Sequence, residues 1–384
     1  GAGHPAWGAA GTGTQSHDPI RRAPVRVAHM SYQHGIPVAN GGQVAVGPQW
    51  GHGTSFAIPN GGPSGGPVDP GPPPRLGDPE TDQAFKDQAV EVIRDSSLLD
   101  PINGTMIDIS PTARGGNSLG TNDGSGHPVN PVTGVRYPPE MVNQADFGRV
   151  MAEFWADGPN SETPPGHWNV LANLVSDELS PNLRIGGSGE PVDRLQWDVK
   201  LYLTVNGAVH DAAIAAWGLK GYYDSVRPIS MVRYMGVLGQ SSDPNGPSYN
   251  KEGLPLVPGL TEVITPETTA PGQRHAALAG HEGEIAIHAW AGNPPDPKNQ
   301  IGGVKWILAA DWVPYQLPTF VTPSFPGYVS GHSTFSRAAA EVLTAFTGGE
   351  YFPGGISGYT ITAGSLKFEK GPGGDIRLEW ATYF

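Results

Sequence analysis

Two cationic side chains seven residues apart are the clearest candidates for chemistry in this sequence. Lys220 and Arg227 lie in the segment Lys-Gly-Tyr-Tyr-Asp-Ser-Val-Arg-Pro, residues 220–228. On one continuous helix, seven residues are about two turns, so both side chains would share a face, about 10 Å apart along the axis. Two long cations on one face can bind an oxyanion between them. The alternative is an ordinary helical ion pair between Lys220 and Asp224, four residues further on.

A Ser-Gly-His turn before a predicted helix is the second candidate. Ser330, Gly331 and His332 would offer a hydroxyl, exposed backbone N–H groups and the positive end of a helix dipole, all of which favour an anion. His332 would then be placed to move a proton to or from an oxygen of that anion. The alternative is an N-cap serine followed by a surface histidine.

A Gly-rich loop rich in oxygen ligands is a weaker candidate, for Ca²⁺. Asn and Asp are also common turn residues, which is the alternative interpretation. The residues concerned are Asp108, Asn117, Asn122 and Asp123.

Two groups of histidines complete the candidates. His281, Glu284 and His288 would share a helical face, but they lack the HExxH spacing of a zinc protease, and a solvated face is the simpler interpretation. His210 and Asp211 lie inside a predicted long helix, where they would form either a supporting pair near a site or a core histidine with a partner.

Composition narrows the classes of protein that are compatible with these candidates. The 384 residues include 55 Gly and 40 Pro, but also 10 Trp, 12 Tyr and 11 Phe, which indicates a folded, loop-rich protein. The formal net charge of −13 without a basic stripe argues against nucleic acid or anionic membrane as partners. With no Cys, the chain has no disulfide and no thiolate chemistry, and this suits exposure to oxidants. No run of 18 apolar residues occurs, so no membrane-spanning helix is expected.

The elements that must position the candidates are predicted to be helices. From Trp197 the apolar residues recur mostly every three or four positions, which indicates a long buried helix that ends by Val226, before Pro228. We expect a mainly α fold with long loops and few short strands, in which residues 1–80 form an irregular wrapping segment and residues 81–384 a helical domain. The other expected helices cover residues 80–98, 139–155, 168–179, 274–291 and 300–310, a stretch from about 229, and the segment after 332.

The order, spacing and flanks of the two main motifs resemble the vanadium-dependent haloperoxidase family, within the type 2 phosphatidic acid phosphatase superfamily. The family pattern Lys-x6-Arg-Pro is matched by Lys220, Arg227 and Pro228. The pattern Pro-Ser-Gly-His is matched from Ser330 to His332, with Val329 in place of the proline. Flanking segments similar to chloroperoxidase-like members are Trp217, residues 322–328, residues 49–51 and residues 154–158.

The resemblance implies a helical bundle that binds vanadate and oxidises halide with hydrogen peroxide to a hypohalous species, which then attacks a small organic substrate. Lys220 and Arg227 would bind equatorial vanadate oxygens, Ser330 and the Gly331 N–H would donate to others, and Lys220 would also hydrogen-bond the peroxide. His332 would be the acid–base group. Trp217 and Phe325 would line the substrate channel, and Phe325 resembles the aromatic residue of chloride-using members. Members of the family are usually exported from the cell, so the resemblance implies export here. It is also compatible with a homo-oligomer.

The family's third motif, Ser-Arg-x5-His, has no full counterpart here. Ser336 and Arg337 begin it, but Leu343 stands where the vanadium-ligating histidine belongs, and His332 is the last histidine in the sequence. In related sequences the motif follows a stretch like residues 378–383, so we expect it beyond Phe384. Two alternatives follow from the same residues: an acid phosphatase of the superfamily, and a non-catalytic structural or assembly protein that retains the fold.

Overall fold

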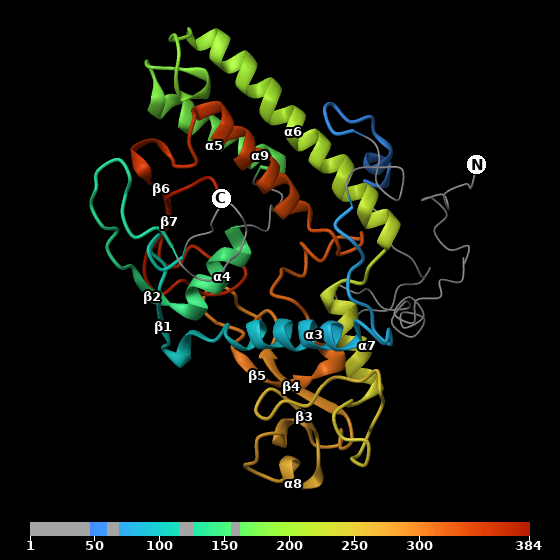
Figure 1. The fold of residues 1–384 in the computed structure, drawn as a ribbon. Coiled ribbons are helices and arrows are strands. Elements are labelled where there is room, and N and C mark those ends of the chain that lie inside the picture. Colours follow the sequence, from blue (N-terminus) through green and yellow to red (C-terminus); the bar gives the residue numbers. More distant parts are fainter. Residues whose placement is uncertain (1–46, 60–68, 115–125, 155–161) are drawn as a thin grey trace, which may run out of the picture.

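The computed structural model describes residues 47–59, 69–114, 126–154 and 162–384. The fold is mainly α, as the sequence predicts, and Figure 1 shows its helices joined by long loops. The division at residue 80 stays a prediction, since residues 1–46 and 60–68 lie outside the described ranges. The α-helices are α3 (Asp82–Ser97), α4 (Gln144–Phe154), α5 (Pro164–Leu179), α6 (Arg194–Tyr223), α7 (Pro228–Leu238), α8 (Pro266–Thr269) and α9 (Gly331–Thr347).

The described strands form three small antiparallel sheets. In the largest, β4 is central, with Glu262 of β3 opposite Ala286 and Trp306 of β5 opposite His288. The other two sheets are the pairs β1–β2 and β6–β7. The strands are β1 (Met106–Asp108), β2 (Met141–Asn143), β3 (Thr261–Val263), β4 (Ile285–Trp290), β5 (Val304–Leu308), β6 (Ser357–Ile361) and β7 (Ile376–Trp380).

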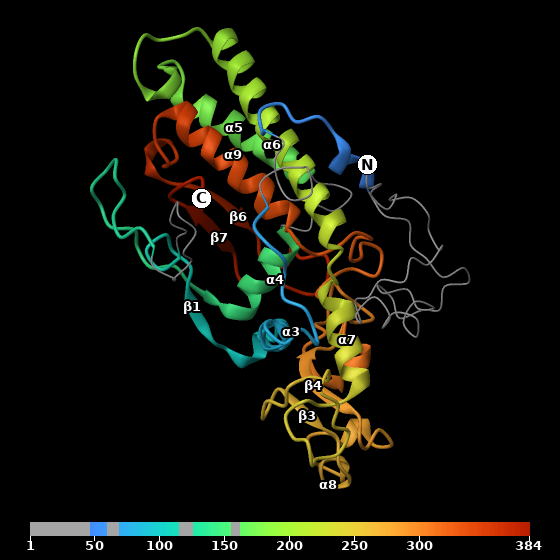
Figure 2. The same cartoon turned by 45° about the vertical axis from the view of Figure 1, so that its right-hand side comes forward.

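Helices α5, α6 and α9 form the layer that carries the predicted motifs. Both views show α6 and α9 running side by side, with α5 against them (Figures 1 and 2). Asp193 caps the start of α6 by accepting the Gln196 N–H at 2.8 Å, and Asp224 ends it in the left-handed conformation. Helix α9 ends at Thr347, and the next residue, Gly348, is also left-handed. Capping residues therefore account for the start of α6 and for the ends of both helices.

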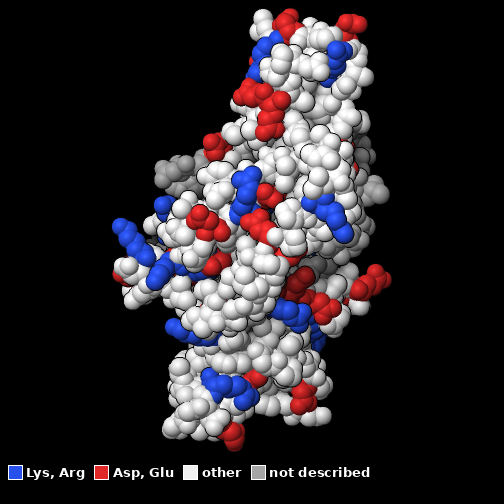
Figure 3. All heavy atoms as spheres, turned by 90° about the vertical axis from the view of Figure 1, so that its left-hand side faces the viewer, with Lys and Arg blue, Asp and Glu red and all other residues white. Residues whose placement is uncertain are grey.

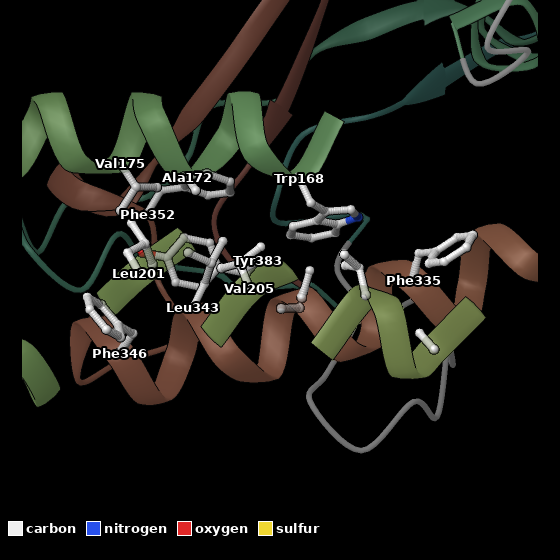
Figure 4. Close-up of a cluster of buried hydrophobic side chains, with 14 of the residues drawn as sticks. Trp168, Ala172, Val175, Leu201, Val205, Phe335, Leu343, Phe346, Phe352 and Tyr383 are labelled. Atoms are coloured by element: carbon white, nitrogen blue, oxygen red, sulfur yellow. The ribbon is translucent and has the colours of Figure 1, made fainter. Parts of the chain in front are cut away.

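A buried apolar cluster joins these three helices (Figure 4). Trp197 of α6 is fully buried and meets Phe346 of α9 edge-on, with ring centroids 4.7 Å apart. Its indole N–H donates to Ser176 of α5 at 2.9 Å, so the ring is buried without an unpaired polar atom. Burying one such side chain contributes about 1.5–3 kcal/mol. The cluster fixes α9 against α6, and with it the relative positions of the two motifs.

Two expected helices, over residues 274–291 and 300–310, are wrong. Strands β4 and β5 occupy these segments, with short 3₁₀ turns at Ala276–Leu278 and Ala309–Asp311. Five of the six residues of β4 are buried, so its apolar residues do not alternate as those of a half-buried strand would. A short, continuously apolar run cannot be assigned to helix or strand from periodicity. Gly280 and Gly283, both with φ above +90°, break any helix that would precede it.

The remaining helix predictions are right within a few residues. The stretch expected to be helical from Pro139 forms strand β2 first, because Met141–Asn143 pair with β1, and α4 begins only at Gln144. Helix α5 begins four residues before Trp168, since Thr163 caps it and Pro164 stands at its first position.

A buried ion cluster holds α4 to the segment before β7. Arg149, 1% exposed, donates to Glu369 Oε1 at 2.8 Å and to Asp146 Oδ1. The other carboxylate oxygen of Glu369 accepts from the Trp290 indole at 3.2 Å and from the Gly302 amide at 2.6 Å. Burial opposes the charge on Arg149, but these carboxylates outweigh it, and the pKa of Arg149 is raised.

On the face shown in Figure 3, the charged side chains form no patch of a single sign. Basic and acidic residues are interspersed there, which agrees with the absence of a basic stripe in the sequence. Within the ranges that the structure describes, none of the helices combines the length and apolar character that crossing a bilayer requires.

Candidate oxyanion site

Lys220 and Arg227 are not on one helical face. Helix α6 ends at Tyr223, and Asp224 follows in the left-handed conformation (φ 46°, ψ 48°), with its N–H donating to the Lys220 carbonyl at 2.9 Å. Arg227 is the N-cap residue of α7, and its backbone is extended because Pro228 follows. The two-turn spacing predicted for a continuous helix is therefore wrong.

A loop brings the two cations together instead. The ammonium of Lys220, 1% exposed, donates to the carbonyls of Pro326 and Gly327 at 2.7 and 2.9 Å. Arg227 Nη1 donates to the Phe325 carbonyl at 3.2 Å. The Phe325 ring lies 5.0 Å from the Lys220 ammonium and 5.1 Å from the Arg227 guanidinium carbon. Both cations thus contact the same three-residue segment.

The hydrogen-bond partners of Lys220 and Arg227 are neutral carbonyl groups. The pKa of Lys220 falls to about 7, because burial disfavours the ammonium and because the charge of Arg227 repels it. Burial also lowers the pKa of Arg227, to about 10. Arg227 Nε is buried without a hydrogen-bond partner in the part of the chain that the structure describes. A bound anion would accept from that N–H and would raise both pKa values.

The Ser330–His332 turn begins α9, as predicted. Ser330 is the N-cap residue, and its hydroxyl accepts from the Ser333 N–H at 3.3 Å, so the capping interpretation holds for this residue. The side chain of His332, the second residue of the helix, is exposed. The first N–H groups of a helix have no partner inside it, so capping by Ser330 leaves donors for an anion.

Trp217 connects the two motifs. Its ring lies 5.1 Å from Phe325, and the Lys220 ammonium lies 5.9 Å from its centroid. At Gly331 a Cβ atom would stand 3.4 Å from the same ring, so glycine lets the first turn of α9 approach it closely. The structure therefore brings together Lys220, Arg227, Phe325, Trp217 and Gly331 at one end of the α6–α9 pair.

Sequence patterns did not indicate that the carbonyls of residues 325–327 are the partners of the cations. A local signal is the pair Pro326-Gly327. A Cβ atom at Gly327 would come within 2.9 Å of the Val226 carbonyl, so the loop can lie against the chain before Arg227 only with glycine there.

The calcium prediction falls mainly outside the described residues. Asn117, Asn122 and Asp123 belong to residues 115–125, which the structure does not describe. Asp108 Oδ1 accepts the N–H groups of Ser110 and Glu140, both at 2.9 Å. Among the residues that are described, no group of three or more His, Cys, Asp or Glu is placed to hold a metal ion.

The other histidine groups differ from their predictions. His281 and Glu284 lie in a turn, 2.9 Å apart, and His288 lies in β4 against Trp306, so they share no helical face. The side chain of His210 is 54% exposed and is not a core histidine. Asp211 is the buried member of that pair, at 2% exposed.

The partial third motif at Ser336 and Arg337 packs against neighbouring side chains. The Ser336 hydroxyl accepts from the Trp168 indole at 3.2 Å. Arg337 pairs with Glu341 at 2.7 Å, and its guanidinium carbon lies 4.7 Å from the centre of the Phe384 ring.

Comparison with known proteins supports the resemblance over the second half of the chain. Residues 200–384 match the family model described as VCPO second helical-bundle domain, a model of the vanadium haloperoxidase type. The match includes both motifs of the candidate site. No curated protein and no solved structure matches the chain.

Proposed function

We propose that Lys220, Arg227 and the N-terminus of α9 bind vanadate, and that the protein uses it to oxidise halide with hydrogen peroxide. The observation that carries this proposal is the pair of buried cations whose hydrogen bonds go to carbonyls, with one buried N–H of Arg227 left over. Burying charge without an opposite charge is costly. We therefore expect an anion to bind here, because its negative charge would offset the cost of burying these two cations.

The residues present fit a tetrahedral oxyanion. A guanidinium, an ammonium and helix N–H groups are the donors that such ions bind in proteins. When bound, vanadate supplies a Lewis-acid centre that makes peroxide electrophilic enough to accept a halide. In this proposal His332 handles protons and is not a ligand of the metal.

Each residue has a separate task in the proposal. Lys220 and Arg227 hold the anion and offset its negative charge. His332 would be the acid–base group that takes up and returns protons at the bound oxygens. Phe325 and Trp217 keep water away from the cations, which strengthens every charge interaction at the site.

Anion binding by the 384-residue chain tests the first step. We expect saturable binding of vanadate and sulfate by calorimetry, with the affinity lowered about 10–100-fold in Lys220→Gln, because a charge-assisted hydrogen bond contributes about 1.5–3 kcal/mol. Lys200→Gln is the matched control, since Lys200 is an exposed residue of the same helix. Equal affinity in the two variants would contradict the assignment of Lys220.

A halogenation assay tests the chemistry. We expect vanadate-dependent halogenation of a phenolic dye with hydrogen peroxide and halide, greatly reduced in His332→Ala while vanadate affinity changes little. Phosphomonoester hydrolysis without halogenation would select the phosphatase alternative. Activity that is unchanged in His332→Ala would remove its acid–base role.

A further inference from the structure

Residues 47–58, which we call the strap, pack along the outer side of α6. The Trp50 ring lies 4.8 Å from Trp217. At Gly51 a Cβ atom would stand 2.7 Å from the backbone nitrogen of Gly218, so the two backbones are in direct contact. The strap therefore contacts the helical turn that ends at Lys220.

Asp211 fixes the other end of the strap. Its carboxylate accepts three consecutive backbone N–H groups, from Phe56 at 2.5 Å, Ala57 at 2.7 Å and Ile58 at 2.9 Å. His210 Nδ1 lies 3.2 Å from the same carboxylate. Burial raises the pKa of Asp211, but these hydrogen bonds outweigh burial and leave it below the usual value. The carboxylate is thus ionised at neutral pH and fully engaged with the strap and its neighbour.

Aromatic contacts lead from the strap to the two cations. Trp50 packs on Trp217, which is 7% exposed, and Trp217 packs on Phe325. Phe325 in turn contacts both the Lys220 ammonium and the Arg227 guanidinium. Trp50 is itself 46% exposed, so the strap is the outermost layer over Trp217. If the strap leaves α6, water reaches Trp217 and then the ring that shields the cations.

We propose that Asp211 is a positioning residue for the oxyanion site: it holds the strap on α6, and the strap keeps Trp217 and Phe325 packed over Lys220 and Arg227. This inference rests on the proposed anion site. Asp211 acts from two to three turns away along α6, because Lys220 is nine residues further on. It contacts neither cation in this arrangement and acts only through the strap and the aromatic rings.

The variant Asp211→Asn tests the inference with little change in volume. The amide places a donor where backbone N–H groups need an acceptor, so at least one of the three hydrogen bonds is lost. We expect faster hydrogen exchange at the amides of residues 56–58 and sulfate affinity about tenfold lower at pH 6. We also expect the pH at which affinity begins to fall to move upward from about 7, because hydration of Lys220 restores its ammonium form.

A second variant releases the strap without touching Asp211. In Gly51→Ala the new methyl group would overlap the Gly218 backbone, so this part of the strap must move away. We expect the same upward shift of the pH profile. The double variant Gly51→Ala/Asp211→Asn should show less than the sum of the two effects, because both act through one segment.

Asp198→Asn is the matched control. Asp198 also lies on α6, but it pairs with Arg194 at 2.8 Å, so its loss should leave the sulfate pH profile unchanged. A general loss of stability would lower the unfolding temperature without moving that profile.

The outcomes separate this inference from the proposed function. If the unmodified chain binds no sulfate or vanadate, the proposed function is wrong. If it binds them as expected, but Asp211→Asn and Gly51→Ala leave the pH profile in place, only the role of Asp211 is wrong. Unchanged exchange at residues 56–58 in Asp211→Asn would likewise show that Asp211 does not hold the strap.

Discussion

Two of the regions in which the molecule buries cations hold them in opposite ways. Arg149 is held by Asp146 and Glu369, and its pKa is raised. Lys220 and Arg227 are held by carbonyls, and their pKa values are lowered. In the first arrangement carboxylates offset the positive charge, whereas in the second the hydrogen bonds among the described residues go to neutral carbonyls.

We interpret the first cation as structural and the second pair as the proposed anion site. The Arg149 cluster ties α4 to the segment before β7, and its two carboxylates already supply the negative charge that an anion would bring. At Phe325 burial disfavours the charged forms of Lys220 and Arg227, and in our proposal a bound anion offsets this cost. The cations of both regions are buried but their pKa values shift in opposite directions, so burial alone does not identify a functional group.

Glu369→Gln should have the largest effect, because it leaves Arg149 buried with only part of its compensation. We expect a loss of about 3–5 kcal/mol in the free energy of unfolding, measured in urea, since removing one partner of a buried pair leaves an uncompensated charge. Glu341→Gln, which breaks the exposed pair with Arg337, is the control and should change stability little. Equal stability of the two variants would contradict the comparison.

The pH dependence of sulfate binding should show the next largest effect. Sulfate does not titrate in this range, so the pH profile reports on the protein. We expect constant affinity below about pH 7, where Lys220 is charged, and a loss of about tenfold per pH unit above it, or about 100-fold by pH 9. Lys220→Gln should give a nearly flat profile.

The stability of the anion-free chain should depend on pH in the opposite sense. The folded pKa of Lys220 lies below its unfolded value of 10.5, so between about pH 7 and 10.5 the unfolded chain binds more protons. The contribution of Lys220 to stability should therefore rise with pH across this window. If stability instead falls as the pH rises, and this fall is absent from Lys220→Gln, then the folded chain stabilises the charged form of Lys220.

Replacing each arginine by lysine should affect the two regions differently. In Arg227→Lys we expect sulfate affinity to fall about tenfold, because the rigid fork of donors is lost, with little change in unfolding free energy. Arg149→Lys should lower stability by about 1–3 kcal/mol and leave sulfate affinity within about twofold. Denaturant unfolding and calorimetry on both variants measure this contrast, and a reversed pattern would exclude it.

Phe325→Leu should have the smallest effect of the series. It keeps an apolar side chain but removes a ring that faces two cations, an interaction of about 0.5–2 kcal/mol. We expect sulfate affinity at pH 6 to change by about threefold or less, and the onset of the pH-dependent fall to move slightly to lower pH. An upward shift would indicate that Phe325 acts mainly by excluding water.

Local patterns in the sequence predicted helices well where the helix edges carry their own signals. Helix α9 follows from Ser330, from the apolar residues that begin at Phe335, and from Gly348. Helix α6 follows from its three- and four-residue apolar spacing. The segment of β4 was assigned wrongly because a strand buried on both faces has no alternation. The segment of β5 is not buried in this way, but it too is a strand only through pairing with β4, which local spacing does not show.

The sequence by itself determined which residue types are available to bind an anion: two cations before a proline, and a Ser-Gly-His turn at a helix start. These depend on side-chain chemistry and on local backbone rules, which short segments express. Only the tertiary structure decided how the cations meet. The chain leaves helix α6 at Asp224. Arg227 and Lys220 then meet through the carbonyls of residues 325–327, which lie about 100 positions further along the chain. Likewise, only the fold places Asp211 under the strap, because contacts between distant segments depend on packing that no local spacing encodes.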